Sequence, residues 1–177
     1  MILTSIVTIR EAADLDTPCW SVLGSLAAAH ARYEHSATII PADWAGRVEE
    51  LLHTGQIALF AALVAGKPIG YASLTWGVST WTASPYGHLD CLYVDDAHRN
   101  EGIGRRLLDA VIAHTQDLGL GDLQWQTPPW NVAAIRFYRR LGADQQTKER
   151  FTLTLDDVFR KKLRAISPGT RQVAKKP

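Results

Sequence analysis

The spacing of apolar and polar residues predicts a strand followed by two helices in the first third of the chain. Residues 5–10 alternate in character, as in a half-buried strand. Residues 11–34 repeat apolar positions at helical spacing, which predicts one helix or a broken pair, with a start signal at Asp16-Thr17-Pro18. A second helix is indicated after residues 41–43, with its apolar positions at Trp44, Val48, Leu51 and Leu52.

The middle of the chain has the pattern of strands. Residues 57–65 are almost continuously apolar and lead through Gly66-Lys67 into a partner strand from Pro68, which predicts a hairpin. Residues 76–87 mix polar and aromatic residues with Pro and Gly, so they indicate a loop or an irregular strand pair. Residues 88–94 alternate again, and this alternation puts Leu89, Cys91 and Tyr93 on one face of the predicted strand.

A helix and a further strand follow this strand. Residues 95–97 predict a turn, and residues 99–104 open a helix. The apolar stripe of that helix consists of Ile103, Leu107, Leu108, Val111 and Ile112. Residues 122–127 predict the next strand, which Pro128-Pro129 ends.

Capping residues bound the helix after that strand, with Asn131 as its N-cap, an end near Leu141 and Gly142 as its C-cap. Residues 143–147 and 150–155 predict a closing strand pair, and residues 156–165 a short helix. The element order is that of a mixed α/β domain with a largely antiparallel sheet. We expect a single domain over residues 1–165 and a basic, flexible tail over residues 166–177.

Composition limits the classes of protein to consider. The 177 residues are 46% hydrophobic and 21% charged, as in an ordinary globular protein. There is no apolar run of roughly 18 residues and no signal-peptide pattern, so we expect neither membrane insertion nor export. Cys19 and Cys91 form no disulfide framework, which favours a reducing compartment and a cytoplasmic location.

The net charge of +1 is unevenly distributed. From residue 156 onward there are seven basic residues and two acidic ones, a net charge of +5 that leaves −4 for residues 1–155. A mildly acidic body is compatible with a small cationic substrate, and the basic end is equally explained as a solvated tail. The basic residues form no patch interleaved with aromatic residues, so we do not expect nucleic-acid binding.

Residues 88–104 form a candidate anion site of the strand–turn–helix type. Gly102 and Gly104 permit close backbone approach, and the N–H groups of the first helical turn are donors for an anion. The helix dipole adds roughly half a positive charge at this end. Together with the Arg99 side chain, the backbone of residues 99–104 therefore predicts a pyrophosphate cradle.

Two motifs resemble one known family. The Arg-x-x-Gly-x-Gly pattern after Tyr93-Val94 resembles the acetyl-CoA pyrophosphate loop of the GNAT superfamily of N-acetyltransferases. Residues 130–143, WNVAAIRFYRRLGA, are the stronger match, because they resemble the N-x-x-A-x-x-F-Y-x-x-x-G helix of those enzymes. The resemblance implies the GNAT fold, in which the two central parallel strands, here 88–94 and 122–127, splay apart and acetyl-CoA lies between them.

The resemblance also implies an activity. Residues 29–34 (AHARYE) and 38–52 are similar to the acceptor-side helices of diamine, polyamine and thialysine acetyltransferases. We therefore expect a primary amine of a small molecule (diamine, amino acid or amine antibiotic) to attack the acetyl group directly. Alternatives are a protein lysine or N-terminal acetyltransferase and a non-catalytic acyl-CoA sensor, although the bulky aromatic residues of segment 76–86 favour a closed pocket. Family resemblance further suggests a homodimer that uses residues 150–155 and the tail.

Two catalytic residues follow from the resemblance. Tyr138 lies on the helix that, in this family, directs a tyrosine at the CoA sulfur, where it would protonate the departing thiolate. Its alternative role is core packing beside Phe137. Asp90 occupies the position of a glutamate in the diamine-type relatives, as a base or as an electrostatic anchor for the ammonium group. Those relatives carry a Glu-Asp pair where this chain has Asp90-Cys91, which weakens the case for polyamines.

Binding residues are carried over in the same way. The expected acceptor site consists of Tyr33, Glu34, Trp81, Tyr86 and Asp90. The expected acetyl-CoA contacts are Leu92, Tyr93, Val94, Arg99, Asn100, Glu101, Gly102, Ile103, Gly104, Asn131 and Tyr138. The backbone N–H near Leu92 or Tyr93 would donate to the oxyanion. We interpret Cys91 as buried packing and His30 as a helix or surface residue, and no histidine spacing indicates a metal site.

Overall fold

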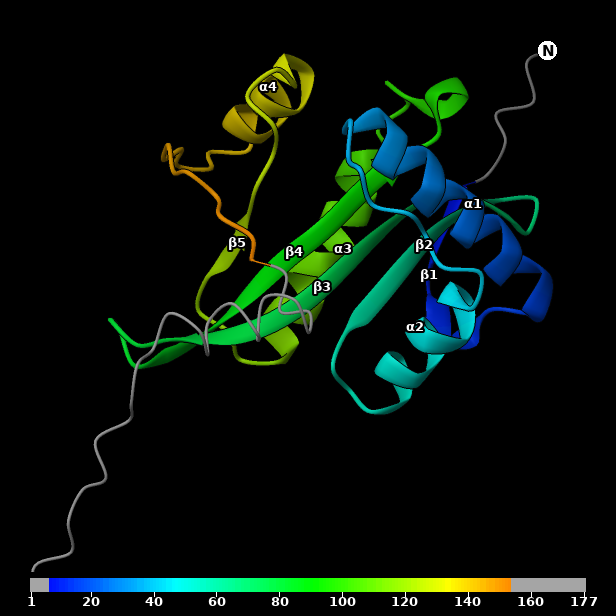
Figure 1. The fold of residues 1–177 in the computed structure, drawn as a ribbon, viewed down its shortest axis with the longest axis horizontal. Coiled ribbons are helices and arrows are strands. Elements are labelled where there is room, and N and C mark those ends of the chain that lie inside the picture. Colours follow the sequence, from blue (N-terminus) through cyan, green and yellow to red (C-terminus); the bar gives the residue numbers. More distant parts are fainter. Residues whose placement is uncertain (1–6, 154–177) are drawn as a thin grey trace, which may run out of the picture. The chain divides into compact units, whose positions relative to one another are not determined.

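In the computed structural model, which describes residues 7–153, five strands form one sheet in the order of the chain (Figure 1). They are β1 (Val7–Glu11), β2 (Ala58–Val64), β3 (Lys67–Ser79), β4 (Ser84–Val94) and β5 (Leu123–Trp125). Strands β1 to β4 pair antiparallel, and β5 pairs parallel to β4. The mixed, mostly antiparallel sheet agrees with the predicted fold class.

Four α-helices are described in the same range. They are α1 (Thr17–Tyr33), α2 (Trp44–His53), α3 (Ile103–Asp117) and α4 (Val132–Arg140). Two short 3-10 turns, η1 (Ala12–Asp14) and η2 (Asp96–His98), follow β1 and β4. Pro18 stands in the first turn of α1, as the start signal predicted, because proline has no N–H to leave unpaired there.

The chain separates into two compact units after Val132, so the unit that begins at Ala133 is described by itself. Its helical part is the rest of α4, and Gly142 follows this helix with a positive φ of 81°. The predicted C-cap is therefore confirmed, because a left-handed glycine after the last turn is the usual helix ending. The domain boundary expected at residue 165 lies outside the described residues and stays a prediction.

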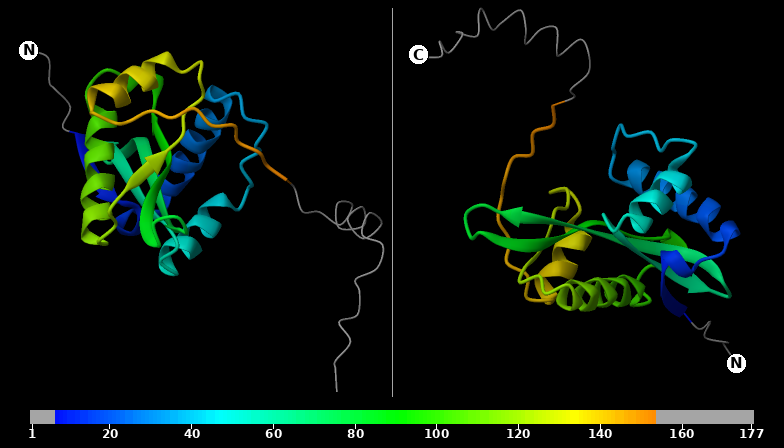
Figure 2. Two further views of the ribbon diagram at one scale, coloured as in Figure 1. Left: turned by 90° about the vertical axis from the view of Figure 1, so that its left-hand side faces the viewer. Right: turned by 90° about the horizontal axis from the view of Figure 1, so that it is seen from below.

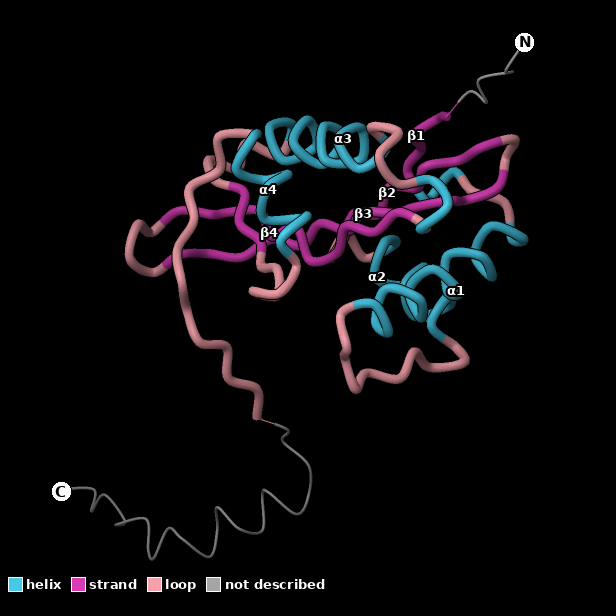
Figure 3. The backbone as a smooth tube through the Cα atoms, turned by 90° about the horizontal axis from the view of Figure 1, so that it is seen from above, coloured by secondary structure: helices cyan, strands magenta, loops and turns pink. Residues whose placement is uncertain are grey.

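Helices cover both faces of the sheet in the first unit (Figures 2 and 3). The face under α1 and α2 has a core that includes Trp20, Leu23 and Leu59. On the opposite face, α3 buries four residues of its predicted stripe, Ile103, Leu107, Leu108 and Val111, whereas the fifth, Ile112, is exposed and was wrongly predicted. Burial of each such side chain contributes roughly 1.5–3 kcal/mol, so packing on both faces stabilises the sheet. No helix in the described part of the chain is long and apolar enough to cross a membrane.

Two hairpins build the antiparallel part of the sheet. Ala65 and Gly66 join β2 to β3 with φ values of 48° and 79°, and two successive positive φ angles are the mark of a tight type I′ turn. Strands β3 and β4 form a longer hairpin, whose outer part extends past the end of β2. Of the two alternatives predicted for residues 76–87, a loop or an irregular strand pair, the strand pair is therefore the one that forms. Strand β3 continues to Ser79, and β4 begins at Ser84.

A β-bulge interrupts β4 at Asp90. Ser73 pairs with Cys91 and the next residue of β3, Leu74, pairs with Leu89, so Asp90 has no partner on β3. An extra residue of this kind reverses the alternation of side chains along a strand. Cys91 and Tyr93 accordingly belong to the α1 face, while Leu89 pairs with Leu74 on the α3 face. The prediction that Leu89, Cys91 and Tyr93 share a face was wrong because the bulge lies between them.

Strand β5 accompanies β4 over a short distance. Its three residues pair with Gly87, His88 and Leu89, and β5 then ends at Trp125. Within the described residues, β4 from Asp90 to Val94 therefore has a strand partner on one side alone. The two parallel strands, β4 and β5, thus pair over three residues only and then separate, as the GNAT fold predicted from the sequence motifs implies.

The predicted closing strands are not formed over residues 143–153, which have no regular secondary structure. The pattern there was wrong as a strand signal because residues 143–149 are mostly polar and offer no apolar face to pack. The rest of the predicted second strand, residues 154 and 155, lies outside the described residues. So do the predicted helix over 156–165 and the basic tail.

Candidate functional site

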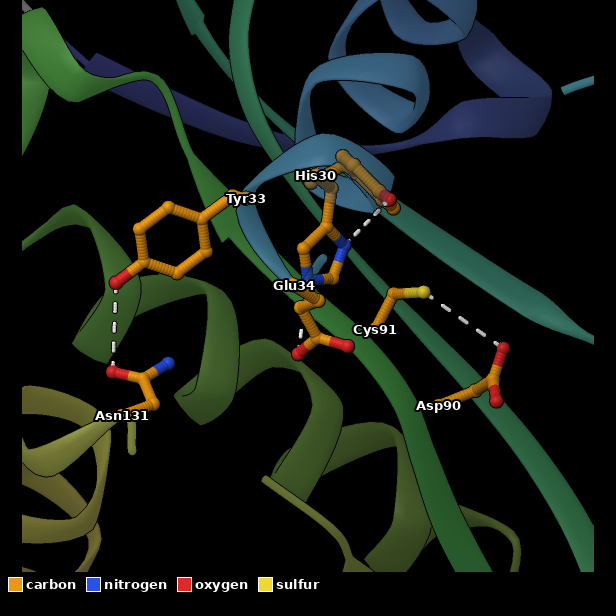
Figure 4. A network of polar contacts seen from close by, with 7 residues as sticks. His30, Tyr33, Glu34, Asp90, Cys91 and Asn131 are labelled. Atoms are coloured by element: carbon orange, nitrogen blue, oxygen red, sulfur yellow. Dashed lines mark hydrogen bonds and ion pairs between the residues drawn. The ribbon is translucent and has the colours of Figure 1, made fainter. Parts of the chain in front are cut away.

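The C-terminal end of α1 meets β3 and β4 in a network of polar contacts (Figure 4). Its centre is His30, which is 9% exposed and lies one helical turn before Glu34. His30 Nδ1 lies 3.0 Å from the Tyr71 hydroxyl of β3, and His30 Nε2 lies 3.5 Å from Glu34 Oε1. The imidazole is also stacked on the Tyr93 ring, with centroids 5.1 Å apart. A histidine predicted to be a helix or surface residue is thus a buried link between α1 and the sheet.

Protonation states in this network can be assigned from burial and geometry. Burial lowers the pKa of His30, with the Glu34 charge opposing the shift, so the imidazole is neutral at pH 7. Burial raises the pKa of Tyr71, which keeps its hydroxyl protonated. The Glu34 carboxylate can only accept, so the single N–H of neutral His30 is on Nε2. Tyr71 therefore donates its hydroxyl proton to Nδ1.

Asp90 and Cys91 continue the network on β4. The bulge leaves the Asp90 side chain 55% exposed, and the Cys91 thiol donates to Asp90 Oδ2 over 3.8 Å. Burial, followed by the Asp90 charge, raises the pKa of Cys91 to about 11. A thiol with such a pKa is protonated at pH 7 and is a poor nucleophile. This supports the interpretation of Cys91 as a packing residue rather than an acyl acceptor.

Tyr33, the last residue of α1, contacts two of the predicted cofactor-binding segments. Its hydroxyl donates to Asn131 Oδ1 over 3.5 Å, and its ring packs against Trp130 with centroids 5.5 Å apart. The Arg99 guanidinium lies over the Tyr33 ring, 4.3 Å from its centroid, in a cation–π contact. Asn131 immediately precedes α4, the place predicted for its N-cap.

The predicted anion cradle has the backbone geometry of a helix N-terminus. Helix α3 begins at Ile103, later than the sequence indicated, because Gly102 and Asn100 have positive φ values of 78° and 64°. The first N–H groups of α3 have no intrahelical acceptor and are donors for an anion. A Cβ on Gly104 would lie 3.9 Å from Val94, so the helix start packs directly on the end of β4.

The Arg99 side chain is held by the loop itself. Its Nε donates to the Val94 carbonyl over 3.0 Å, and its Nη2 lies 2.6 Å from Asp96 Oδ1. Glu101 pairs with His98 at 3.7 Å, on the outside of the same loop. In this arrangement the Arg99 Nε and Nη2 groups contact the loop, and the backbone amides at the start of α3 are donors available to a phosphate group.

A comparison with family models decides what this arrangement belongs to. Residues 10–143 match the model of the acetyltransferase (GNAT) family, and this range includes strands β2 to β5, the network around His30 and the cradle. The chain belongs to the GNAT acetyltransferase family. The resemblance of the two motifs is thereby confirmed, and with it the predicted fold.

Curated relatives of this GNAT chain include small-amine acetyltransferases. The thialysine N-epsilon-acetyltransferase of Caenorhabditis elegans is 29% identical over 99 residues, which are 55% of this chain and 61% of that protein. The L-ornithine N5-acetyltransferase NATA1 of Arabidopsis thaliana is 36% identical over 56 residues, 32% of this chain and 25% of that protein. The chain thus spans about a quarter to three fifths of the length of these relatives.

A solved structure shares the GNAT fold over nearly all of its length. It is an aminoglycoside acetyltransferase from an uncultured soil metagenomic sample, in complex with sisomicin. The TM-score is 0.70 at 24% identity, and the match covers 85% of this chain and 97% of that one. At this identity the similarity supports the fold alone.

Some of the predicted acceptor residues are brought together in this GNAT domain. Glu34 and Asp90 lie on different elements, yet the charges of both act on His30, Tyr71 and Cys91. The two carboxylates therefore border the same network, one on α1 and one on β4. Tyr33 adjoins this network through the edge of the Tyr93 ring, with centroids 6.4 Å apart.

Other predicted residues are not brought to this network within the chain. Trp81 lies in the turn between β3 and β4 and is 96% exposed. Tyr86 packs over Gly77 on the same hairpin. It stands seven residues before Tyr93 on β4, a separation of about 23 Å along a strand. Segment 76–86 is therefore part of a long hairpin, and the expectation that it closes a pocket stays a prediction.

Tyr138 lies on α4, in the second unit, and its ring packs against Phe137 with centroids 5.2 Å apart. Sequence reasoning missed His30 and Tyr71 as site residues. One signal was available for His30, since it precedes Glu34 by four residues and thus shares its helix face. No group of three or more potential ligands in residues 7–153 is arranged to hold a metal ion.

Proposed function

We propose that this GNAT protein transfers the acetyl group of acetyl-CoA to a primary amine of a small molecule by direct attack. One observation carries the proposal: a single strand, β4, has a carboxylate at its bulge and leads into an anion cradle. Asp90 at the bulge stands four residues before Val94, the last residue of β4, and nine residues before Arg99, where the cradle begins. A cation-binding group and a phosphate-binding group at this spacing suit a positively charged acceptor and a pyrophosphate-containing donor.

The residues present fit acetyl-CoA as the acyl donor. The left-handed Gly102 and the free amides at the start of α3 suit its pyrophosphate. The β4 edge that β5 leaves unpaired, from Leu92 to Val94, offers backbone groups along which the rest of the molecule would lie. Asn131 and the cradle residues Arg99, Asn100, Glu101, Ile103 and Gly104 complete the proposed set. Bound acetyl-CoA supplies a thioester carbonyl and a thiolate leaving group.

The acceptor amine has to lose a proton before it attacks. At pH 7 an alkylammonium with a pKa near 10.4 lies about 4–5 kcal/mol below its free amine. Asp90 is half exposed, and its proposed role is to hold the ammonium or, directly or through water, to take its proton. A backbone N–H near Leu92 or Tyr93 then stabilises the oxyanion.

Tyr138 is the proposed acid that protonates the departing sulfur. Its phenol, with an ordinary pKa near 10, matches a thiolate with a pKa near 8.5. The support comes from the match of residues 130–143 to the family helix and from the position of α4 directly after Asn131. Replacing Tyr138 by Phe removes the proton and keeps the ring. We expect turnover to fall at least about tenfold, with the alkaline limb of the pH profile altered; near-full turnover with an unchanged profile would leave Tyr138 a packing role.

A small amine is the preferred acceptor class. Relatives named for thialysine and ornithine, and structural neighbours named for aminoglycosides, act on small amines. The carboxylates of Glu34 and Asp90 and the ring of Tyr33 would recognise an ammonium group. Trp81 and Tyr86, also proposed for this site from the family resemblance, would need a position different from their place in the isolated chain.

We also propose a cytoplasmic homodimer that binds neither membrane nor nucleic acid and uses no metal. Both cysteines are free, which suits a reducing compartment, and the family resemblance supports the dimer. The proposed catalytic domain extends to residue 165. Light scattering coupled to size-exclusion chromatography checks the dimer directly, since a monomer mass at micromolar concentration contradicts it.

Release of CoA thiol from acetyl-CoA tests the function. The panel consists of diamines, polyamines, thialysine, ornithine, aminoglycosides and a histone-type peptide. A strong response to one small amine supports the proposal and names the acceptor class. A response confined to the peptide favours a protein acetyltransferase, and acetyl-CoA binding without release on any member favours an acyl-CoA sensor.

A further inference from the structure

A series of neighbouring polar groups lies between the two carboxylates of the proposed amine site. It runs from Glu34 through His30 to the Tyr71 hydroxyl, with contacts of 3.5 and 3.0 Å. Tyr71 neighbours Cys91, since each influences the pKa of the other, and the Cys91 thiol donates to Asp90 Oδ2 over 3.8 Å. His30 and Tyr71 are buried and Cys91 is half-buried, whereas the Glu34 and Asp90 side chains are 37% and 55% exposed. A change in the charge of the buried His30 therefore alters the electrostatic environment of the exposed carboxylates at the proposed amine site.

His30 is the member whose ordinary pKa lies nearest to neutrality. Several titratable or charged groups face it from every neighbouring element. They are Glu34 on α1, Tyr71 on β3, Asp90, Cys91 and Tyr93 on β4, and Arg99 in the loop before α3. Of these, Glu34 and Asp90 favour the imidazolium, while burial and Arg99 favour the neutral ring. Geometry and charge together make His30 the group of the network whose protonation is most easily changed.

The two protonation states of His30 differ in what they do to Glu34. The neutral ring has one N–H, which faces Glu34, and its Nδ1 accepts from Tyr71. Glu34 then keeps its full negative charge. The imidazolium has a second N–H, so the Tyr71 hydroxyl has to turn its proton away, and the positive ring then neutralises the Glu34 carboxylate. An ammonium group competes with the imidazolium for the same carboxylate.

We propose that His30 is a positioning residue of the amine site, which sets the charge that Glu34 presents to the substrate. The neutral imidazole orients Glu34 as an anion for a cationic amine, and the imidazolium cancels it. This rests on the proposed N-acetyltransferase function. By linkage, protonation of His30 and binding of the amine weaken each other by the same factor. The site therefore selects cationic acceptors and loses affinity for them as the pH falls through the pKa of His30.

NMR titration of the full chain with labelled histidine rings tests the coupling without an activity readout. Glu34→Gln should lower the pKa of His30, because the carboxylate charge that favours the imidazolium is removed. The panel amine with the fastest CoA release, added at saturation, should lower it in the wild type and have little effect in E34Q. The exposed His53 at the end of α2 is the internal control and should not move.

The pH profile of kcat/KM for the same amine tests the consequence. Relative to His30→Gln, the wild type should lose about a further tenfold for each pH unit below the pKa of its histidine. Ionisation of the amine is common to both proteins and cancels in the ratio. His53→Gln is the matched control and should follow the wild-type profile. The excess loss should lie in KM rather than kcat, and Tyr71→Phe, which keeps the ring, should shift the acid limb.

The outcomes separate the two proposals. If no amine of the panel is acetylated, the proposed function fails and this inference falls with it. If an amine reacts but the pKa of His30 does not respond to it, and the profiles of wild type and H30Q run parallel, this inference alone is overturned. If H30Q does not fold, as judged by circular dichroism, the NMR titrations of wild type and E34Q decide, together with the profile of Y71F.

Discussion

The two halves of β4 differ although they belong to one strand. Its first half, around Leu89, pairs with β3 on one side and β5 on the other and packs under α3. Its second half, from Asp90 to Val94, pairs with β3 alone and contributes Cys91 and Tyr93 to the polar network under α1. One extra residue separates the two halves. The comparison indicates that a bulge converts a structural strand into one that also presents chemistry.

The largest expected effect belongs to the structural half. Leu89 is 3% exposed, so Leu89→Ala should reduce the free energy of unfolding by about 2–5 kcal/mol through a cavity under α3. Urea denaturation measures this loss. Activity per folded molecule should change much less than stability. A stable L89A protein that is inactive would mean that the two halves are not separable.

The next largest effect is expected in the second half of β4, where a substitution should reduce activity and leave stability nearly unchanged. Asp90→Asn removes the charge at the bulge while keeping the side-chain volume, so kcat/KM for the amine should fall at least about tenfold, or 1.4 kcal/mol. The unfolding midpoint should stay near that of the wild type. Asp117→Asn, the same charge change at the exposed end of α3, is the control. A neutral effect of D90N would remove both proposed roles of Asp90.

A glycine beyond the second half tests whether the cradle depends on backbone conformation. Gly102 has φ +78° and no atom near the position of a Cβ, so Gly102→Ala adds conformational strain of about 1 kcal/mol without a clash. Gly55 has φ +65° and equally free surroundings, which makes Gly55→Ala a matched control for strain. Both variants should lose similar stability. Only G102A should raise KM for acetyl-CoA, by about tenfold, since a hydrogen bond to a charged group contributes about 1.5–3 kcal/mol.

The smallest effect on activity is expected at Cys91. Cys91→Ala should keep kcat within about threefold, because a half-buried thiol that is not a nucleophile is replaced by a smaller apolar group. The thiol itself reports the environment. With a pKa of about 11 against an ordinary 9.0, it holds about a hundredfold less thiolate at pH 8 than a free cysteine. Its alkylation by iodoacetamide in a Cys19→Ser background should therefore increase up to about pH 11; a midpoint near 9 would contradict the burial argument.

Local pattern predicted most of the elements because each depends on a short stretch of sequence. The two glycine-ended turns, the start of α1 at Pro18 and the stripe of α3 follow from backbone preference and apolar spacing. The bulge at Asp90 could not be predicted in this way. A register shift is a property of two strands, and the alternation within β4 gives no sign of the residue that β3 leaves unpaired.

Candidate site residues could be predicted where they belong to a sequence motif. They could not be predicted where they come together only through packing between distant parts of the chain. The cradle and Asp90 stand in recognisable patterns, so they could be proposed as site residues from the sequence alone. His30 lies on a helix that was predicted, but its burial results from Tyr71, which is 41 residues away in the sequence. The strands predicted over residues 143–147 and 150–155 are not formed up to residue 153 for a related reason. These residues are mostly polar and lack an apolar face that would pack against a neighbouring element as a strand.

The order of the strands also has a consequence for how the protein folds. Strands β1 to β4 are neighbours in the sheet in chain order, and the β2–β3 turn has two residues, so much of their pairing is local. The parallel pairing of β5 with β4 has to wait until the intervening chain, including α3, has crossed over. The diverging parallel edge is thus the part of the sheet that we expect to form late. A nascent chain would have its antiparallel sheet before the place for its co-substrate is complete.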